Sequence, residues 1–310
     1  MNIYINIEIS ERELDSKLLL AVIAAAKGHQ VIISDNSGID RGFRSKLFAP
    51  GIFHTKCITP LDKKVNFHQA LIQNGYLITS IDEEAGLDMV GYEEFSKTRY
   101  SEQTIEQSSA VFAWGKDDLE FLEKFYPKHK SKIHKTGSPR IDLLNSSFLK
   151  YWKIPKKIPK RPYLLVSSNM GKANYIKPFF ELIRENRDIG YYKRDEKMFK
   201  QDFYWAAEDY FKTYSFIEAI KYLAENNNGF DIIFRPHPVE NINSWKIYLE
   251  GLPNVHVIRE GPITPWILNS FALMHSGCTT AIEATVAKKP VVSYVPFKMN
   301  YTSTLTNNFG

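Results

Sequence analysis

The sequence predicts an α/β protein with two domains, each built around a parallel sheet. Short apolar runs typical of buried strands alternate along the chain with longer segments of helical periodicity, which favours parallel strands joined by helices. A run rich in proline and lysine interrupts this alternation at residues 153–162. The length of 310 residues is enough for about two such domains. We therefore expect two Rossmann-like domains, residues 1–152 and 163–310, joined by a linker over 153–162.

The first domain opens with a β-α-β unit. Residues 4–9 alternate as a strand does, and residues 14–27 are rich in Ala and Leu at helical spacing. Gly28 ends that helix before a strand over 30–34. The other elements expected in this domain are strands at 51–54, 76–79, 110–114 and 133–136 and a helix at 117–125.

The linker and a second α/β unit follow. Residues 153–162 carry three prolines and five basic residues, which neither a helix nor a central strand tolerates. We interpret this run as a solvated hinge, the alternative being a basic patch that attracts anionic lipid or a charged acceptor. The second unit is expected to hold strands at 163–169, 231–234, 255–258, 272–274 and 291–294 and helices at 203–225, 265–269 and 281–287.

Composition and charge indicate a cytoplasmic protein that binds anions. No window holds the ~18 uninterrupted apolar residues of a membrane span, and the N-terminus lacks the basic-then-apolar pattern of a signal peptide. Cys57 and Cys278 have neither metal-ligand spacing nor a disulfide framework. The net charge of +5 suits anionic ligands or peripheral contact with an anionic membrane at its inner face, and it is too mild to predict nucleic-acid binding.

A strand-to-helix junction carries the first predicted anion site. Small side chains there let the backbone approach a ligand, and the unpaired amides at a helix start carry partial positive charge. The predicted phosphate-binding residues are Ser276, Gly277, Cys278, Thr279 and Thr280, with Glu283 one turn inside the helix for ribose hydroxyls. The alternative is a capping box between Thr280 and Glu283.

A second anion site is predicted at Arg235-Pro236-His237-Pro238, directly after a strand. The prolines stiffen the turn, so Arg235 and His237 are both expected to face a phosphate. His237 can in addition donate a proton to a leaving phosphate oxygen. The alternative is a rigid turn whose arginine pairs with a carboxylate.

Three consecutive acids, Asp82, Glu83 and Glu84, follow the strand at 76–79. Sites in open α/β sheets form at the carboxyl ends of strands, and a carboxylate there can act as nucleophile, base or electrostatic partner. The alternation of a strand predicts that Asp82 and Glu84 point together and Glu83 points away. The alternative is a helix start enriched in acids.

Weaker signals come from two other strand ends. Arg140 follows one of them, and Ser168 and Asn169 follow another; each is a predicted nucleotide- or phosphate-binding residue. The sequence contains no Asp-x-Asp motif suited to holding Mg²⁺ on a nucleotide sugar. We therefore expect no metal and no cofactor, with amides, Arg and His neutralising the leaving phosphate.

Seven short stretches along the chain, taken in order, resemble the bacterial surface carbohydrate biosynthesis proteins. Those proteins are GT-B glycosyltransferases related to capsule Kdo transferases, with kinship to the polyol-phosphate transferases of teichoic acid synthesis. The matching stretches are residues 11–14, 82–86, 114–115, 136–142, 168–169, 235–238 and 275–284. The family also has a closing C-terminal helix, which the polar residues 301–310 do not predict.

The resemblance implies two Rossmann-like domains facing across a cleft. It implies a donor in which CMP activates a 2-keto sugar acid such as Kdo or a sialic, legionaminic or pseudaminic acid, and a surface glycan or lipid-linked glycan as acceptor. Arg235, His237 and the loop 276–280 would then bind CMP, and the acidic triplet would face the anomeric carbon. Three rivals stay open: a CDP-polyol phosphotransferase, a UDP-sugar epimerase and a non-catalytic nucleotide-binding module.

Overall fold

The computed structural model describes residues 1–84, 98–193, 197–227, 229–302 and 304–308. These residues fall into two compact units, which divide between Asn145 and Ser146. Among the described residues, the first unit holds 1–84 and 98–145, and the second begins at 146. The expected linker 153–162 lies in the second unit and contains neither helix nor strand, as its prolines predict.

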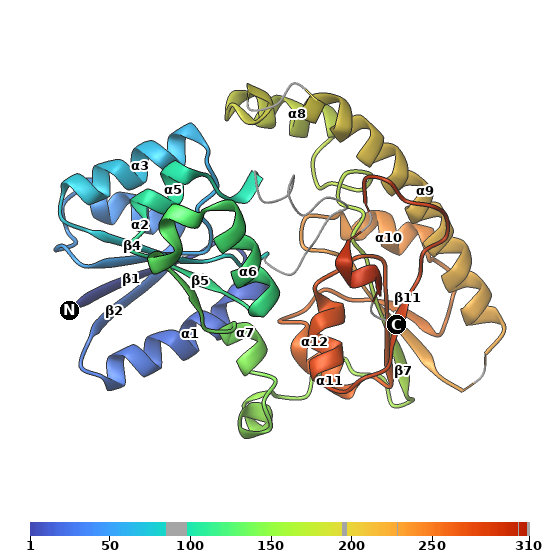
Figure 1. The fold of residues 1–310 in the computed structure, drawn as a ribbon. Coiled ribbons are helices and arrows are strands. Elements are labelled where there is room, and N and C mark those ends of the chain that lie inside the picture. The colour runs from blue at the N-terminus through green and yellow to red at the C-terminus, as the bar shows by residue number, and fades with distance from the viewer. Residues whose placement is uncertain (85–97, 194–196, 228, 303, 309–310) are drawn as a thin grey trace. The chain divides into compact units, whose positions relative to one another are not determined.

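The first unit is a six-stranded sheet in which every pairing is parallel, in the order β2-β1-β3-β4-β5-β6 (Figure 1). Its strands are β1 (Asn2–Ile7), β2 (Gln30–Asp35), β3 (Ile52–Thr55), β4 (Leu77–Ile81), β5 (Ala110–Ala113) and β6 (Ile133–Lys135). Its helices are α1 (Ser10–Ala26), α2 (Asn36–Arg44), α3 (Asp62–Gln73), α5 (Glu102–Gln107), α6 (Lys116–Phe125) and α7 (Pro139–Asp142).

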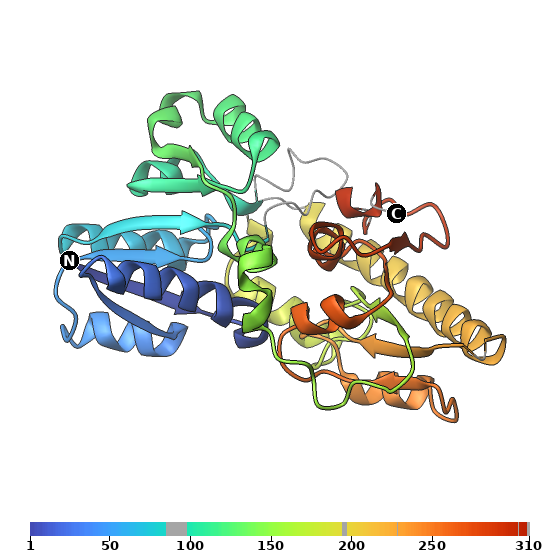
Figure 2. The ribbon, with the colours of Figure 1, turned by 90° about the horizontal axis from the view of Figure 1, so that it is seen from below.

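Helices cover both faces of this sheet (Figures 1 and 2). On one face, α2 and α3 pack Ile39 and Leu71 against Phe53 and Ile78 of the strands. On the other face, α1 buries the polar residues Glu13, Ser16 and Lys17. Burying a charge is costly unless it is paired, so α1 must meet opposite charges at the sheet.

The second unit is a five-stranded parallel sheet in the order β11-β10-β7-β8-β9. Its strands are β7 (Tyr163–Ser167), β8 (Asp231–Arg235), β9 (Val255–Val257), β10 (Ala272–His275) and β11 (Val291–Ser293). Its helices are α8 (Phe179–Asp188), α9 (Lys197–Glu225), α10 (Ile242–Tyr248), α11 (Thr264–Asn269) and α12 (Thr280–Val286).

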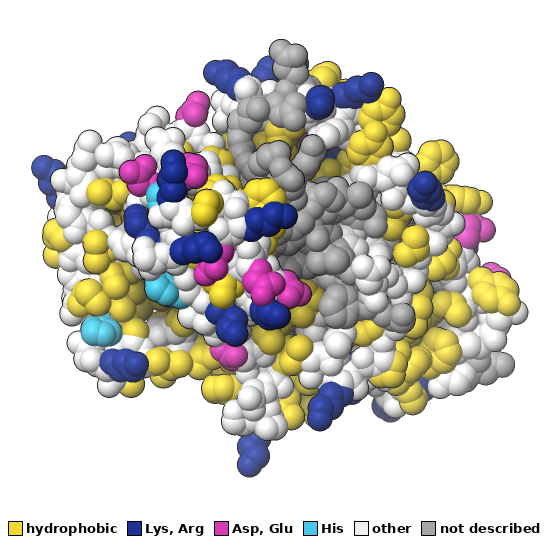
Figure 3. Space-filling model, viewed as in Figure 1, with side chains coloured by type: hydrophobic (Ala, Val, Ile, Leu, Met, Phe, Trp, Pro, Cys, Tyr) yellow, Lys and Arg dark blue, Asp and Glu magenta, His cyan; other side chains and the backbone are white. Residues whose placement is uncertain are grey.

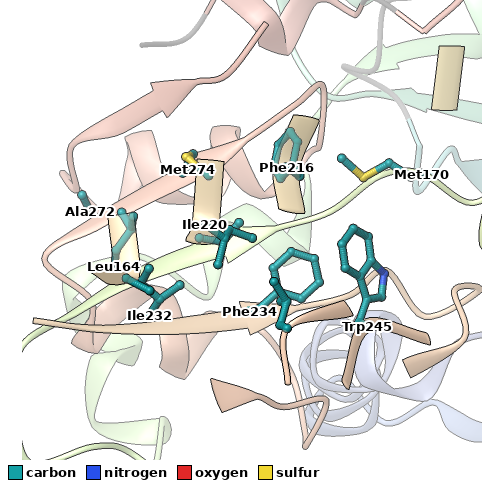
Figure 4. Packing of buried hydrophobic residues seen from close by; sticks show 12 residues of the cluster. Leu164, Met170, Phe216, Ile220, Ile232, Phe234, Trp245, Ala272 and Met274 are labelled. Carbon is teal, nitrogen blue, oxygen red and sulfur yellow. The ribbon is translucent and has the colours of Figure 1, made fainter. Parts of the chain in front are cut away.

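The core of the second unit lies on both faces of its sheet. On one face, Phe216 and Ile220 of α9 and Trp245 of α10 pack against β7 and β8 (Figure 4). The Trp245 ring lies 4.3 Å from that of Phe234, centroid to centroid. On the other face, α11 and α12 bury Trp266, Ile267, Ala281 and Ala284. A sheet buried on both faces accounts for the continuous apolar runs of its strands.

The structure confirms each of the eleven predicted strands and the predicted helices, with ends that differ by a few residues. Six of the helices in the described part of the chain were not predicted: α2, α3, α5, α7, α8 and α10. They are short or polar, and α2 contains Gly38 and Gly42, which lower helix propensity. In the part of the chain described, no helix is both long enough and apolar enough to cross a bilayer.

Candidate functional site

The strand order of each sheet marks where a ligand is expected. In open α/β sheets, ligands bind beyond the carboxyl ends of the strands, where the strand order reverses direction. In the second unit this switch point lies between β7 and β10, and in the first it lies between β1 and β3. The loops after β7 and β10 carry two of the predicted motifs, at Ser168-Asn169 and at 276–280.

Side chains join the loops of the second unit at this switch point. The Asn169 amide donates to the Gly277 carbonyl over 2.7 Å. The Ser168 hydroxyl donates to Glu240 over 2.8 Å and accepts from the His237 backbone N–H over 3.1 Å. The structure therefore brings together the predicted residues Ser168, Asn169, Gly277 and His237.

The loop after β10 is organised by His275, a residue that sequence reasoning did not single out. Its Nδ1 accepts from the backbone N–H groups of Gly277, over 3.1 Å, and Cys278, over 3.4 Å. These are two of the amides expected to bind phosphate. Ser276 is fully buried, and its hydroxyl lies 3.9 Å from the Met299 sulfur.

Gly277 is needed for both its conformation and its small size. Its φ of +71° is a left-handed conformation that favours glycine. A Cβ atom there would lie 2.9 Å from the Thr304 hydroxyl and 3.0 Å from the Asn307 side-chain oxygen. The segment after β11 therefore packs against this loop, and Thr304 and Asn307 join the candidate site.

The start of α12 lacks the capping box that would have explained Thr280 and Glu283 structurally. The N-cap residue Thr279 makes no side-chain capping hydrogen bond. Thr280 and Ser167, the last residue of β7, are both buried. Among the described residues, neither hydroxyl has a hydrogen-bond partner. Two buried hydroxyls in this state can each bond to a ligand oxygen. In the sequence, Ser167 belongs to the weak strand-end signal Ser167-Ser168-Asn169.

The two predicted site residues of the Arg235–Pro238 loop contact different groups. Arg235 is buried and donates to the carbonyls of Glu260, over 3.0 Å, and Gly261, over 2.8 Å. Its guanidinium also lies over the Trp266 ring at 5.1 Å. The alternative interpretation of this loop was a rigid turn in which Arg235 pairs with a carboxylate; in the structure the partners of Arg235 are backbone carbonyls. His237 is half-buried, and its Nδ1 accepts from Val239 N over 3.4 Å. A proton on Nε2 then makes His237 a donor.

Glu240 fixes the geometry of these loops and was also missed. It accepts from Ser168 Oγ over 2.8 Å, Met170 N over 2.9 Å and Trp245 Nε1 over 2.6 Å. Burial raises the pKa of Glu240 to about 7, against the opposing effect of these hydrogen bonds. It has no strand-end or motif signature, so only its spatial neighbours reveal its role.

A buried charge network on the inner face of α9 supports the same loops. Lys212 pairs with Asp209 over 2.8 Å and donates to the Asn169 carbonyl over 3.1 Å. Lys172 pairs with Asp202 over 2.5 Å, and its backbone N–H donates to Asp209. Asn169 is thus held by Lys212 on one side and by its bond to Gly277 on the other.

In the first unit, basic side chains pair with the acidic triplet. Asp82 and Glu84 share Arg99, at 2.6 Å and 2.9 Å respectively. Glu83 turns instead to Lys17 of α1, at 2.6 Å. This confirms that Asp82 and Glu84 point together and Glu83 away. Only Glu84 is accessible, with 30% of its side chain exposed, and Arg12 lies 3.6 Å from it.

Other polar groups gather at the same edge of the first sheet. Glu13 of α1 accepts from Glu8 N over 3.0 Å and from Arg12 over 3.0 Å, and burial raises its pKa. Burial and the nearby Lys17 lower the pKa of His54 well below its usual value, so His54 is neutral. Arg140, predicted to bind nucleotide, is buried in α7 of this unit, whereas the other predicted nucleotide-binding residues belong to the second.

Among the described residues, no group of three or more His, Cys, Asp or Glu side chains is arranged to hold a metal ion. The expectations of metal-free chemistry and of no cofactor stay predictions.

Comparison with known proteins identifies the fold. No protein-family model matches the chain, and no curated protein matches it. The chain is similar to a putative UDP-N-acetylglucosamine 2-epimerase from Listeria monocytogenes, with a TM-score of 0.56 and 14% identity over 96% of this chain and 80% of that one. It is also similar to the wall teichoic acid polymerase TagF soaked with CDPG, with a TM-score of 0.52 and 10% identity over 98% and 72%. At these identities the likeness concerns the fold, and it confirms two Rossmann-like domains of the GT-B type.

The raised pKa of Glu240 predicts a pH-dependent stability. The pKa of Glu240 in the folded protein lies above its ordinary value. The stability that protonated Glu240 contributes is therefore fully present below about pH 4.5 and is lost as pH rises through about 7. Glu240→Gln should remove this decrease of the unfolding free energy with pH, whose slope is at most about 1.4 kcal/mol per pH unit. Urea unfolding between pH 5 and 8 measures it. The exposed control Glu225→Gln should keep the wild-type slope, and equal slopes in all three proteins would contradict the assignment.

The Lys17–Glu83 pair should be critical for the stability of the first unit. Glu83→Gln leaves the buried Lys17 ammonium without its counter-charge, which costs about 3–5 kcal/mol. Lys17→Met combined with Glu83→Gln should recover most of that loss. Glu84→Gln, at the more exposed position, should cost about 1 kcal/mol or less. Thermal and urea unfolding measure the loss of stability in each variant. A Glu83→Gln protein as stable as wild type would show that the Lys17–Glu83 pair is not critical.

Proposed function

We propose that this chain is a glycosyltransferase that moves a 2-keto sugar acid, of the Kdo or nonulosonic acid type, from a CMP-activated donor to a surface glycan. The observation that carries the proposal is the junction of the loops after β7 and β10 at the switch point of a parallel sheet. Two buried hydroxyls without partners among the described residues, Ser167 and Thr280, lie on the elements that form it. The GT-B-type fold supports a nucleotide-sugar substrate by analogy.

The donor phosphate is assigned to the second unit. Departure of CMP builds negative charge on the phosphate and positive charge at the anomeric carbon. His237 would donate from Nε2 to a phosphate oxygen, while Thr280 and Ser167 would supply hydroxyl donors. Arg235 holds the loop of His237 in place through its bonds to two carbonyls, and its predicted contact with the phosphate stays part of the proposal. In this proposal no metal takes part.

The acceptor chemistry is assigned to the acidic triplet of the first unit. Asp82 and Glu83 are buried in ion pairs, which leaves Glu84 as the carboxylate with an exposed surface. It would activate the acceptor hydroxyl or face the positive charge at the anomeric carbon. Arg99 and Arg12 hold it in position.

Two rival activities draw support from particular comparisons. The likeness to TagF favours a CDP-polyol phosphotransferase, and the likeness to the Listeria epimerase favours a UDP-sugar substrate. A non-catalytic nucleotide-binding module would use the second unit alone. The nucleotide that binds separates the UDP-sugar enzyme from the other two, the donor that is consumed separates those two, and the effect of Glu84 separates an enzyme from a module.

We expect CMP to stabilise the protein against thermal unfolding, with or without EDTA. A ligand at 100 times its Kd adds about 2.7 kcal/mol. A shift with UDP alone would favour the epimerase. A CDP-polyol phosphotransferase also releases CMP, so transfer from a CDP-polyol in place of a CMP-sugar would favour that rival.

His237→Ala should weaken CMP binding by about tenfold or more, the scale of one charged hydrogen bond. The control His129→Ala changes a histidine of the first unit and should leave CMP binding unchanged.

Glu84→Gln should keep CMP affinity and lose transfer by about 10²-fold or more, the scale expected for a positioned base or nucleophile. Transfer is assayed with CMP-Kdo and CMP-nonulosonic acids, beside a CMP-binding measurement. Glu106→Gln, an exposed glutamate of α5, is the matched control and should be fully active. Full activity in Glu84→Gln would remove the triplet from the chemistry.

A further inference from the structure

Over residues 202–214, helix α9 buries charged side chains and exposes aromatic ones, the opposite of an ordinary surface helix. Its inner face carries Asp202, Asp209 and Lys212, all buried. Between positions 203 and 214, every exposed residue is aromatic or alanine. They are Phe203, Tyr204, Ala207, Tyr210, Phe211 and Tyr214. A surface helix normally turns its charged residues outward. Hydrophobic side chains gather along the edge of the molecule where α9 runs (Figure 3).

These exposed residues form one continuous stripe. Their spacings of three and four residues place them on a single face of the helix. Tyr210, Phe211 and Tyr214 at its centre are 60%, 66% and 63% exposed. The five aromatic side chains of the stripe together present roughly 600 Å² of surface. That area is most of the about 800 Å² that each partner buries in a stable protein–protein interface.

Charges at the two ends of the stripe have opposite signs. The first turn of α9 holds Lys197 and Lys200 and no acid, and its last turn holds Glu225 and no base. Glu218 is exposed one turn beyond the aromatic stripe. This arrangement opposes the helix dipole, which favours acids at the start of a helix and bases at its end. Within a single chain it is unfavourable, so a neighbour that supplies the opposite charges would explain it.

We propose that the aromatic face of α9 binds the same face of a second copy of this chain, with the two helices antiparallel. A twofold axis near Asp209 would place Lys200 of each copy opposite Glu218 of the other. It would also place Ala207 opposite Phe211, so that a small residue leaves room for a ring. Each contact occurs twice in such an interface, because the same patch is used on both subunits.

The second copy fits this face better than an anionic bilayer does. A bilayer would attract the lysine end and repel the end that carries Glu218 and Glu225. An antiparallel copy brings each charged end against its opposite and sets the two helix dipoles antiparallel, side by side.

The test is the oligomeric state of the whole chain, measured by analytical ultracentrifugation and light scattering between about 1 and 100 µM, a range that covers a dimer of micromolar Kd. Wild type should be a dimer. Phe211→Ser with Tyr214→Ser should raise the dimer Kd by about 100-fold or more, as expected for central aromatic contacts. Ile247→Ser, an equally exposed apolar position on α10, is the control and should leave the dimer unchanged.

Charge reversal tests the antiparallel register. Lys200→Glu and Glu218→Lys should each raise the Kd by about tenfold, because like charges then meet twice. The two changes together should restore it to within about threefold of wild type. The charge variants alter exposed positions only, so they remain informative if the serine variant fails to fold.

Three outcomes would overturn the proposal. They are a wild-type monomer at about 100 µM, a dimer that is indifferent to the charge variants, and a monomer that binds phosphatidylglycerol vesicles and loses that binding in Tyr214→Ser. The last outcome would assign the face to a membrane surface. None of these measurements depends on nucleotide or sugar, so the result is separate from the proposed transfer activity.

Discussion

The wholly parallel pairing of both sheets is the constraint on which the rest of the structure depends. Every strand ends at the same edge of its sheet, so the polar residues that follow the strands gather there without any long loop to carry them. In the second unit this brings Ser168, Asn169, Gly277 and His237 together. In the first unit it gathers the acidic triplet beside the start of α1.

Gathering polar groups at one edge also means burying some of them, and each unit resolves this with a paired network. Glu240 accepts three hydrogen bonds and links the loops after β7 and β8. Lys17 and Glu83 neutralise each other beneath the triplet. Buried polar groups that lose a partner are costly, so such networks hold a single geometry. Glu84 and His237 lie beside these networks and keep accessible surface.

The same logic explains α9. Its inner face is occupied by charged residues that hold Lys172 and Asn169, so the apolar residues of the helix are distributed between a deep core strip at Phe216 and Ile220 and the outer aromatic stripe. The loops of the candidate site and the outer surface are therefore coupled through one helix, on opposite faces of it.

The sequence by itself determined the strands, their alternation with helices and the placement of each motif at a strand end. These features follow from local periodicity, proline content and apolar runs, which read the same in any tertiary context. The run 153–162 holds neither helix nor strand, as its prolines predict, but the two units divide earlier, between Asn145 and Ser146. The opposite orientation of Glu83 relative to Asp82 and Glu84 was predicted from strand alternation, but β4 ends at Ile81, and a turn in which the Glu84 N–H donates to Asp82 sets this orientation.

Only the tertiary structure decided which group each side chain meets. Arg235 ends a strand and carries the same charge in any fold, and only the tertiary structure places it against the carbonyls of residues 260 and 261. The ring of His275 accepts the amides of Gly277 and Cys278, and Thr304 and Asn307 lie against Gly277 from a segment after the last strand. Glu240 bonds to Ser168, 72 residues away in the chain. Partners so distant in sequence leave no local pattern, because a hydrogen bond depends on a few ångströms and degrees that only the packed sheets and helices set.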